Sequence, residues 1–272
     1  MGFAGTRATG MLGAGHIARL SVTGTITEDR RLIAAIDDAR RDASVRAMIL
    51  VVDSPGGTMA GGEALHGALS RFAVQKPLVA TLGGTAASAG YMIALPADRV
   101  FARNGTITGS IGVLLQSFEA SDLLARLGVS PETITSGPLK DQPSLFRPLT
   151  EEGRVALALV VNDLYEQFVR MVAQGRRMHE IAARALADGR IVTGRRALDL
   201  GMIDAIGGEA EARVWLAAER GIPETVPVRA LDPRPLSERA FASAVSMVGK
   251  TLYTEWLGPI LRIDGPMAVW QR

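Results

Sequence analysis

The stretch PLVATLGGTAASAGYMIAL, residues 77–95, decides the fold of this 272-residue chain. Leu78 to Leu82 have the apolar pattern of a strand, and the glycines and alanines that follow suit a helix in a buried α/β core. Residues 77–97 carry no charge over a length that could formally span a bilayer, but three glycines, two prolines and several hydroxyls interrupt them. We therefore expect a buried strand and helix here, and no transmembrane segment in the chain.

The same alternation of a short apolar run with a helical pattern recurs on both sides of this stretch. The pairs are ARLSVTGTI with DRRLIAAIDDARRD, RAMILVVDS with GGEALHGALSRFA, PLVATL with AASAGYMIAL, and DRVFA with TGSIGVLLQ. Such a succession of βαβ units is typical of stacked parallel strands, so it predicts an α/β fold. A long helix is then expected over residues 150–176 with Thr150 as its N-cap, followed by a strand, a short helix, a turn and a further helix over residues 185–221.

The composition is that of a globular protein and excludes several kinds of chemistry. The formal net charge is only +2 and the basic residues form no Lys/Arg run, so we expect no nucleic-acid partner. The chain has no cysteine, which excludes disulfides, thiolate metal sites and a cysteine nucleophile, and leaves the redox compartment undetermined. The chemistry must come from other residues.

The composition changes along the chain and suggests three parts. Residues 1–16 are an N-terminal extension without a continuous apolar segment, and residues 17–221 are the α/β domain. Residues 222–272 begin as a proline-rich connector and continue as an amphipathic helix, with apolar residues at intervals of three and four. We expect this helix to pack on its own domain or on a neighbouring subunit; peripheral membrane contact through residues 239–262 is the alternative.

Two glycine-rich turns follow neighbouring strands and are predicted to meet at one edge of the sheet. The first is Asp53-Ser54-Pro55-Gly56-Gly57, whose backbone N–H groups could form an oxyanion hole. The second leads to Ser88, whose hydroxyl would stand at a helix N-terminus. Taken singly, the first could be an ordinary turn and Ser88 a capping or core serine, but their convergence favours a nucleophile.

A nucleophilic serine needs a base, and the chain offers few. None of the three histidines, His16, His66 and His179, has a setting that resembles a catalytic triad, although His66 is the least implausible. A lysine with a lowered pKa can accept the proton instead. Of the three lysines, Lys76 precedes a strand and Lys250 lies in the tail, whereas Lys140 lies in a Gly/Pro-punctuated loop of the kind that carries catalytic groups.

Four motifs, in this order along the chain, resemble those of the signal peptide peptidase A (SppA) family of serine peptidases in its short, single-domain form. The similarity runs from about residue 17 to residue 220. The motifs are Asp53-Ser54-Pro55-Gly56-Gly57, Ala86-Ala87-Ser88-Ala89-Gly90-Tyr91, Gly109-Ser110-Ile111-Gly112-Val113 and Ser136-Gly137-Pro138-Leu139-Lys140-Asp141. The resemblance implies a ClpP/crotonase-like fold of repeated ββα and βαβ units, with the tail as a C-terminal helical appendage.

The resemblance also implies a role for each matching residue. Ser88 corresponds to the nucleophile, Lys140 to the general base and Ser110 to the residue that orients the lysine. The backbone N–H groups of Gly57 and Ala89 would stabilise the oxyanion. No metal, nucleotide or other cofactor is required.

The implied function is a serine endopeptidase that cleaves signal peptides or other short hydrophobic peptides through an acyl-enzyme. Gly56, Thr58 and Tyr91 are candidates for the substrate groove. The resemblance further implies a ring-like homo-oligomer whose subunits complete each other's grooves. Because we expect no transmembrane segment in the chain, we expect it in the cytoplasm or peripherally on the inner membrane. A crotonase-like enzyme acting on an acyl-CoA and a non-catalytic oligomeric scaffold are the alternatives. The acyl-CoA alternative gives Lys140 no role.

Overall fold

The central sheet is built by strands that cross over through helices, as the alternating pattern predicts. The computed structural model describes residues 15–231 and 233. Three long parallel strands pair in register, so that Leu20 lies beside Leu50 and Leu50 beside Ala80. The elements in this half are β1 (His16–Ile26), α1 (Arg30–Arg41), β2 (Val45–Gly57), α2 (Met59–Ala73) and β3 (Leu78–Ala87).

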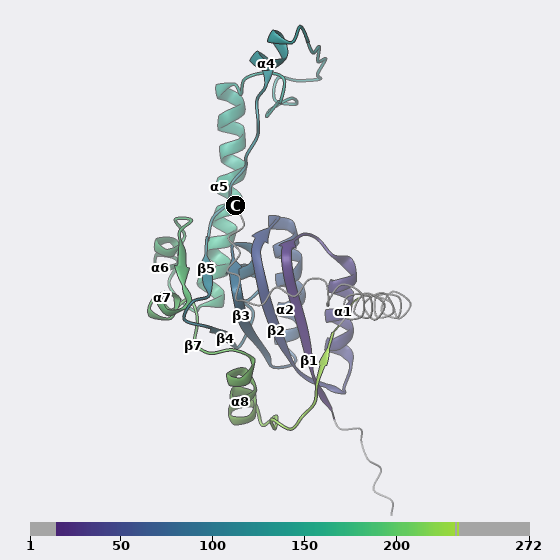
Figure 1. Ribbon diagram of the computed structural model, residues 1–272, viewed down its shortest axis with the longest axis vertical. Coiled ribbons are helices and arrows are strands. Elements are labelled where there is room, and N and C mark those ends of the chain that lie inside the picture. The colour runs from purple at the N-terminus through teal and green to yellow at the C-terminus, as the bar shows by residue number, and fades with distance from the viewer. Residues whose placement is uncertain (1–14, 232, 234–272) are drawn as a thin grey trace, which may run out of the picture. The chain divides into compact units, whose positions relative to one another are not determined.

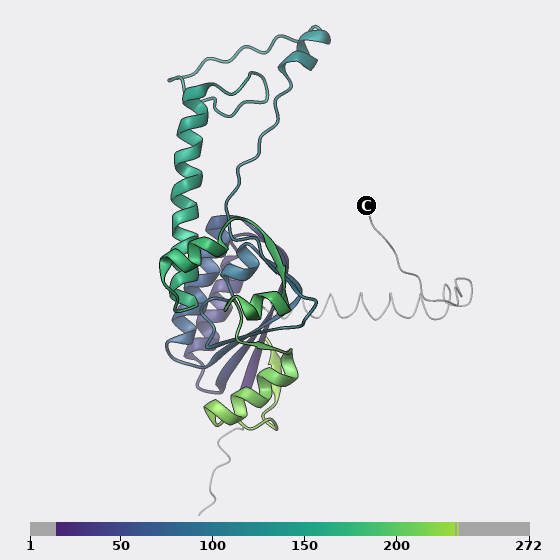
Figure 2. The same ribbon diagram turned by 90° about the vertical axis from the view of Figure 1, so that its left-hand side faces the viewer.

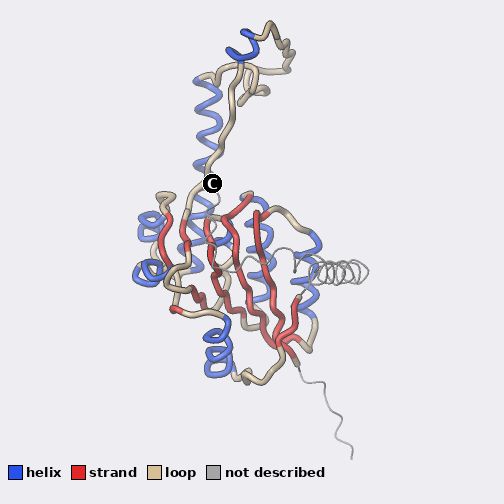
Figure 3. The backbone as a smooth tube through the Cα atoms, in the orientation of Figure 1, coloured by secondary structure: helices blue, strands red, loops and turns tan. Residues whose placement is uncertain are grey.

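In the part of the chain that the structure describes, eight strands form one sheet. Figures 1 and 3 show its long strands side by side, and β3 pairs on one side with two strands, β4 and β5. The order along the main path is β6-β5-β3-β2-β1-β8. Off this path, β4 pairs with β3, and β7 pairs with β4. Residues 79–82 of β3 pair with β4, whereas residues 85–87 pair with β5, so β3 changes partner just before Ser88. Only the β5–β6 pair is antiparallel among the described strands. The remaining strands are β4 (Arg99–Ala102), β5 (Ile107–Gly109), β6 (Ile191–Thr193), β7 (Ala205–Ile206) and β8 (Val228–Ala230).

The apolar run in β2 is continuous because both faces of the sheet are covered. Met48 and Leu50 point into the larger core cluster with Phe72 of α2, whereas Ile49 belongs to a second cluster that includes Leu216 of α8. Successive strand residues point to opposite faces, so a strand that is buried on both faces needs apolar residues at every position. The helices after β3 are α3 (Ala89–Met92), α4 (Ser121–Arg126), α5 (Glu151–Gly175), α6 (Glu180–Leu186), α7 (Gly194–Asp199) and α8 (Glu209–Arg220).

A long arm projects from the sheet domain. Figures 1 and 2 show the first half of α5 running away from the sheet, with residues 114–120 rising beside it to α4 at the outer end. The predicted N-cap of α5 is confirmed, because the Thr150 hydroxyl accepts a hydrogen bond from the Gly153 N–H at 3.0 Å. Most of the exposed large apolar side chains of the described residues lie between residues 114 and 160, on this arm.

The structure differs from the sequence-based expectations in several elements. TGSIGVLLQ, residues 108–116, was expected to be helical, but its first two residues end β5 and the rest has no regular structure. Residues 86–95 were expected to be helical, but the strand continues to Ala87 and only Ala89–Met92 form a helix. Val228–Ala230, in the expected connector, form β8 and pair with β1. The expected N-terminal extension, apart from residues 15 and 16, and the tail helix with its membrane-contact alternative at residues 239–262 lie outside the described residues.

None of the described helices, the 25-residue α5 included, combines the length and the apolarity that crossing a bilayer needs.

Candidate active site

Ser88 occupies a sharp turn between the end of β3 and the start of α3. Its backbone has φ 54° and ψ −124°, a conformation that non-glycine residues rarely adopt. The turn is held on both sides, because the Ser88 N–H donates to the Gly109 carbonyl at 2.8 Å and its own carbonyl accepts from the Met92 N–H at 2.9 Å. A strained strand-to-helix turn of this kind exposes a nucleophile at the edge of a sheet.

The turn at Gly56 and Gly57 packs directly against Ser88. A Cβ atom at Gly56 would lie 2.8 Å from the Ser88 Cβ, and the φ of +122° at Gly56 is unfavourable for any other residue. A Cβ atom at Gly57 would lie 1.8 Å from the Ile26 carbonyl oxygen, so this position also excludes a side chain. The buried Ser54 hydroxyl accepts a hydrogen bond from the Gly56 N–H at 3.1 Å and so holds the turn. The two predicted glycine-rich turns therefore meet.

Two buried threonines, which no motif in the sequence marked, hold the end of β3: Thr108 lies on β5 and Thr106 directly precedes it. The Thr106 hydroxyl donates to the Gly83 carbonyl at 2.7 Å, and the Thr108 hydroxyl donates to the Ala86 carbonyl at 2.6 Å. Buried hydroxyls need such partners, and here they satisfy carbonyls at the point where β3 changes partner. The alternation Thr106-Ile107-Thr108 was the only signal for them in the sequence.

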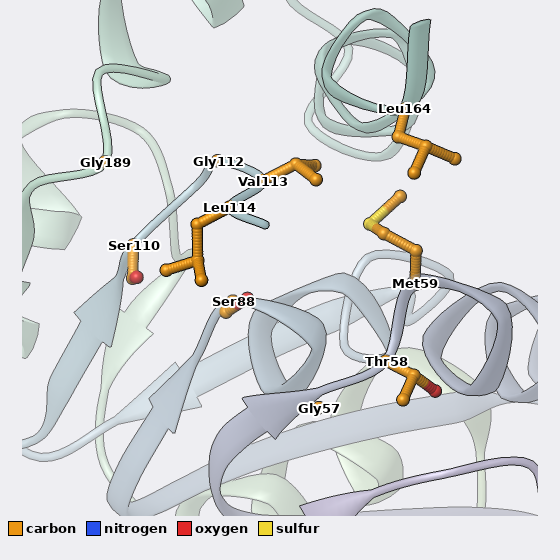
Figure 4. Close-up of a pocket in the computed structure, with 10 residues that line it drawn as sticks. All are labelled: Gly57, Thr58, Met59, Ser88, Ser110, Gly112, Val113, Leu114, Leu164 and Gly189. Atoms are coloured by element: carbon orange, nitrogen blue, oxygen red, sulfur yellow. The ribbon is translucent and has the colours of Figure 1, made fainter. Parts of the chain in front are cut away.

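Ser110 lies at the end of β5, beside the end of β3. Like Ser88 it has a positive φ, of 51°, and its N–H donates to the Arg190 carbonyl at 2.7 Å. Ser88 and Ser110 are both half-buried, and both line one cavity. The structure thus brings the proposed nucleophile and the proposed lysine-orienting residue together (Figure 4).

The cavity has a volume of about 670 Å³ and a largely apolar wall. Figure 4 shows Leu164 and Met59 facing each other across it from α5 and α2, with Val113 and Leu114 on a third side. The lining residues are Gly57, Thr58, Met59, Ser88, Ser110, Gly112, Val113, Leu114, Leu164 and Gly189. A cavity of this size and character suits one or two apolar side chains of a ligand beside the serines.

The other predicted site residues are placed differently. The Ala89 side chain is buried, and its N–H is the first of α3, a position with no acceptor inside the helix. Gly56 is buried against Ser88 and does not itself line the cavity, whereas Thr58 does. Tyr91, which we expected in the groove, lies fully buried in the core, where its hydroxyl is satisfied by donating to the Met202 carbonyl at 2.8 Å.

The cavity wall, as formed by the described residues, contains no histidine and no lysine. His66 lies on α2, where burial lowers the pKa of its imidazole, and His179 is the N-cap of α6. His16 begins β1 beside Ser44, on a different part of the sheet. The histidines that could have replaced a lysine base therefore do not line the cavity.

Lys140 does not line the cavity of its own chain either. It is exposed and belongs to the segment between α4 and α5, which lies at the outer end of the arm in Figures 1 and 2. The backbone N–H of Lys140 donates to the Gly137 carbonyl at 3.2 Å, within a local turn. The single chain therefore places the proposed base and the proposed nucleophile apart.

Comparison with known proteins identifies the relatives of this chain. The profile described as Peptidase family S49 matches residues 70–223, a segment that includes Ser88, Ser110 and Lys140. The chain belongs to peptidase family S49. The predicted SppA resemblance is confirmed, and the protein is a serine peptidase with a ClpP/crotonase-like α/β fold.

Two relatives and one solved structure show how far the similarity to this S49 peptidase extends. A Synechocystis sp. protein provisionally named a protease is 38% identical over 226 residues, which cover 82% of each chain. An Enterococcus faecium protein provisionally named signal peptide peptidase SppA is 33% identical over 223 residues, which cover 76% of this chain and 64% of that protein. A membrane-bound stomatin-specific protease, solved as a lysine-to-alanine variant with a substrate peptide, is similar in fold, with a TM-score of 0.53 and 17% identity over 86% of this chain and 100% of that chain.

Proposed function

We propose that this S49 peptidase is an endopeptidase with a Ser/Lys dyad, in which Ser88 is the nucleophile and Lys140 the general base. The observation that carries the proposal is the position of Ser88: it stands on a strained turn, against Gly56, and opens onto an apolar cavity. Ser110 lines the same cavity and is proposed to orient the lysine amine. No histidine from the described residues competes for the role of base in that cavity.

The lysine is proposed to come from a second copy of the chain. Lys140 is carried on the arm, away from the Ser88 of its own subunit, and the arm exposes many apolar side chains. Burying those side chains against a neighbour would stabilise an oligomer, and the same contact would bring an arm loop to the neighbour's cavity. A ring-like homo-oligomer, in which each arm completes the next site, satisfies both requirements.

The assembly also explains how a lysine could act as a base. An exposed lysine has a pKa of about 10.4 and is protonated at neutral pH, so it cannot accept a proton. Desolvation in a closed interface disfavours the charged amine and lowers its pKa, and the Ser110 hydroxyl could then hold the neutral amine in place. The base would therefore form only on assembly or on substrate binding.

The proposed reaction follows from these positions. The neutral Lys140 amine takes the proton of the Ser88 hydroxyl as Oγ attacks a peptide carbonyl carbon. The Gly57 and Ala89 N–H groups would donate to the resulting oxyanion, and the protonated lysine would return its proton to the leaving amine. A water that is deprotonated by the lysine then attacks the ester carbon, the bond to Ser88 Oγ breaks, and the lysine returns the proton to Oγ as the second product leaves.

The cavity supports a preference for small or apolar side chains at the cleavage site. Met59, Leu164 and Val113 give its wall an apolar character. The small residues Gly57 and Thr58 also line it. Signal peptides and other short hydrophobic peptides have the side chains that such a cavity binds. We propose them as the substrate class.

The test is hydrolysis of a fluorogenic apolar peptide by the wild-type protein, Ser88→Ala and Lys140→Ala. We expect each variant to lose at least about a thousandfold in kcat, because removal of either dyad member stops acyl-enzyme formation. Mass spectrometry after reaction with a serine-directed acylating inhibitor should find the adduct on Ser88 only. Normal activity of Lys140→Ala together with binding of coenzyme A would contradict the proposal and favour an acyl-CoA enzyme.

A further inference from the structure

The feature that carries a further inference is the short turn Asp188-Gly189-Arg190, which contacts the segment around Ser110. Gly189 lines the same cavity as Ser88 and Ser110 (Figure 4). The turn belongs to a different part of the chain, between α6 and β6, and the proposed mechanism gives it no role.

The turn brackets Ser110 with hydrogen bonds on both sides. The Ser110 N–H donates to the Arg190 carbonyl at 2.7 Å, and the Gly189 N–H donates to the Ile111 carbonyl at 3.1 Å. Gly109, just before Ser110, has φ +88°, and a Cβ there would lie 2.8 Å from the Arg190 carbonyl oxygen. The Arg190 carbonyl therefore lies where it both binds the Ser110 N–H and requires glycine at position 109.

These contacts matter because Ser110 has a conformation that costs energy. A serine with φ 51° persists only where its surroundings define it, and Gly109 beside it also has a positive φ. The peptide group that precedes the Ser110 Cα is held by the Arg190 carbonyl, which binds its N–H, and by the Ser88 N–H, which donates to its Gly109 carbonyl. The Gly189 N–H holds the Ile111 carbonyl, one peptide group beyond Ser110. Displacement of the turn would let Ser110 relax and would move its hydroxyl within the cavity.

The Asp188 side chain in turn shapes the turn itself. Its Oδ1 accepts a hydrogen bond from the Arg190 N–H at 3.1 Å, which is the geometry of an Asx turn, and Gly189 between them has φ +84°. The carboxylate also accepts hydrogen bonds from the Arg190 Nε at 2.8 and 2.7 Å. Both side chains are largely exposed, so their ion pair adds little to the stability of the whole protein. The effect of Asp188 is therefore local.

We propose that Asp188 is a positioning residue for the peptidase reaction, which acts by holding the Arg190 carbonyl, and through it the backbone of Ser110, in place. The proposal rests on the function proposed for Ser110. It predicts that the acceptor oxygen at position 188 matters more than the charge, because the Asx turn needs only an oxygen, whereas the exposed ion pair needs a carboxylate.

The test compares Asp188→Ala, Asp188→Asn and Arg190→Ala with the wild-type oligomer in the fluorogenic peptide assay. We expect Asp188→Ala to lower kcat about fivefold, the effect of losing one hydrogen bond, with little change in KM. Asp188→Asn keeps the acceptor and should restore kcat to within about twofold of wild type, as should Arg190→Ala, which keeps the Asx turn. Equal losses in Asp188→Ala and Asp188→Asn would overturn the proposal, because they would show that charge matters.

A double-mutant cycle with Ser110→Ala separates this proposal from the function on which it rests. If Asp188 acts through Ser110, adding Asp188→Ala to Ser110→Ala should cause no further loss of kcat. Full additivity of the two losses would overturn the proposal. It would also be overturned if the Asp188→Ala protein did not fold, or if it were less stable but had normal kcat when folded. Full activity of Ser110→Ala would instead refute the role of Ser110 itself.

Discussion

At the scale of single residues, the site depends on two backbone conformations that its surroundings impose. Ser88 keeps a φ of 54° because hydrogen bonds to Gly109 and Met92 hold both of its peptide groups. Gly56 makes room for it, because any side chain there would collide with the Ser88 Cβ. Ser88 can therefore keep this conformation only if position 56, on the neighbouring strand β2, has no side chain.

We predict that Gly56→Ala removes peptidase activity and destabilises the fold. The new Cβ would lie 2.8 Å from the Ser88 Cβ, at a residue whose φ of +122° already disfavours alanine. Gly24→Ala is the matched control, since Gly24 has φ +70° but open space around it. Thermal unfolding should show that the control loses about 1 kcal/mol of unfolding free energy, and its kcat should be normal. Gly56→Ala should lose more unfolding free energy and should have no measurable kcat. Normal cleavage by Gly56→Ala would contradict the contact.

The residue scale also shows what the sequence could and could not predict about the site. Ser88 and the turn at Gly56 were predictable, because glycine-rich turns after parallel strands must meet at one edge of the sheet. The core position of Tyr91 was not, because its hydroxyl partner, the Met202 carbonyl, is 111 residues away. The clamp of Arg190 on Ser110 is likewise a long-range contact that no local pattern indicates.

At the scale of elements, α5 is fixed to the sheet domain at its C-terminal end. Arg176, its C-cap, makes two hydrogen bonds to the Asp204 carboxylate, at 3.1 and 2.7 Å, and Asp204 also accepts from the Val100 N–H at 2.7 Å. The arm is thus held by a largely buried ion pair tied to β4. The helix and its Thr150 N-cap were predictable from local pattern, whereas this attachment and the pairing of β8 with β1 depend on residues distant in sequence.

The Arg176–Asp204 pair should make the stability of the domain depend on acid. Burial acts to raise the pKa of Asp204, but the hydrogen bonds and charge of Arg176 outweigh it, so the pKa lies below its usual value. A lowered folded-state pKa means that the contribution is complete above the unfolded value of about 3.9 and is lost as pH falls through the folded value. We therefore expect the free energy of unfolding to fall as the pH drops below about 4.

Urea unfolding of Asp204→Asn at pH 7 and pH 3 tests this expectation. At pH 7 the variant should be less stable by about 3 kcal/mol, because Arg176, whose side chain is only 8% exposed, loses its carboxylate. Its stability should also change less between the two pH values than that of wild type. The control is Asp199→Asn, from an exposed pair with Arg196, which should behave like wild type. An unchanged acid dependence in Asp204→Asn would show that other groups cause it.

At the scale of the whole molecule, the exposed arm and the incomplete cavity point to the same proposal. The cavity of one chain lacks a base among its described lining residues, and the arm that carries Lys140 exposes apolar side chains such as Leu159 and Ile134, 66% and 92% exposed. Assembly would bury the apolar side chains of the arm and would supply the cavity with a base. A sequence pattern alone cannot show this, because it places Ser88 and Lys140 in one chain without indicating which copies meet.

We predict that a charge on the arm weakens both assembly and activity. Leu159→Glu should lower the sedimentation coefficient and reduce activity per subunit by about tenfold or more, because a carboxylate is costly in an apolar interface. Val214→Glu is the control: Val214 is 52% exposed on α8, outside the arm, and its variant should keep both properties. A fully active monomer of Leu159→Glu would show that one chain suffices.

The most direct test of a dyad shared between copies is to mix the two inactive variants, Ser88→Ala and Lys140→Ala. The subunits would be dissociated, combined in equal amounts and reassembled, and mass spectrometry would verify that mixed oligomers have formed. Mixed oligomers should recover a substantial part of the wild-type peptidase activity, because an intact Ser88 can then meet an intact Lys140 from a neighbour. Mixed oligomers that remain as inactive as either variant alone would contradict the shared site and place both residues of the dyad in one chain.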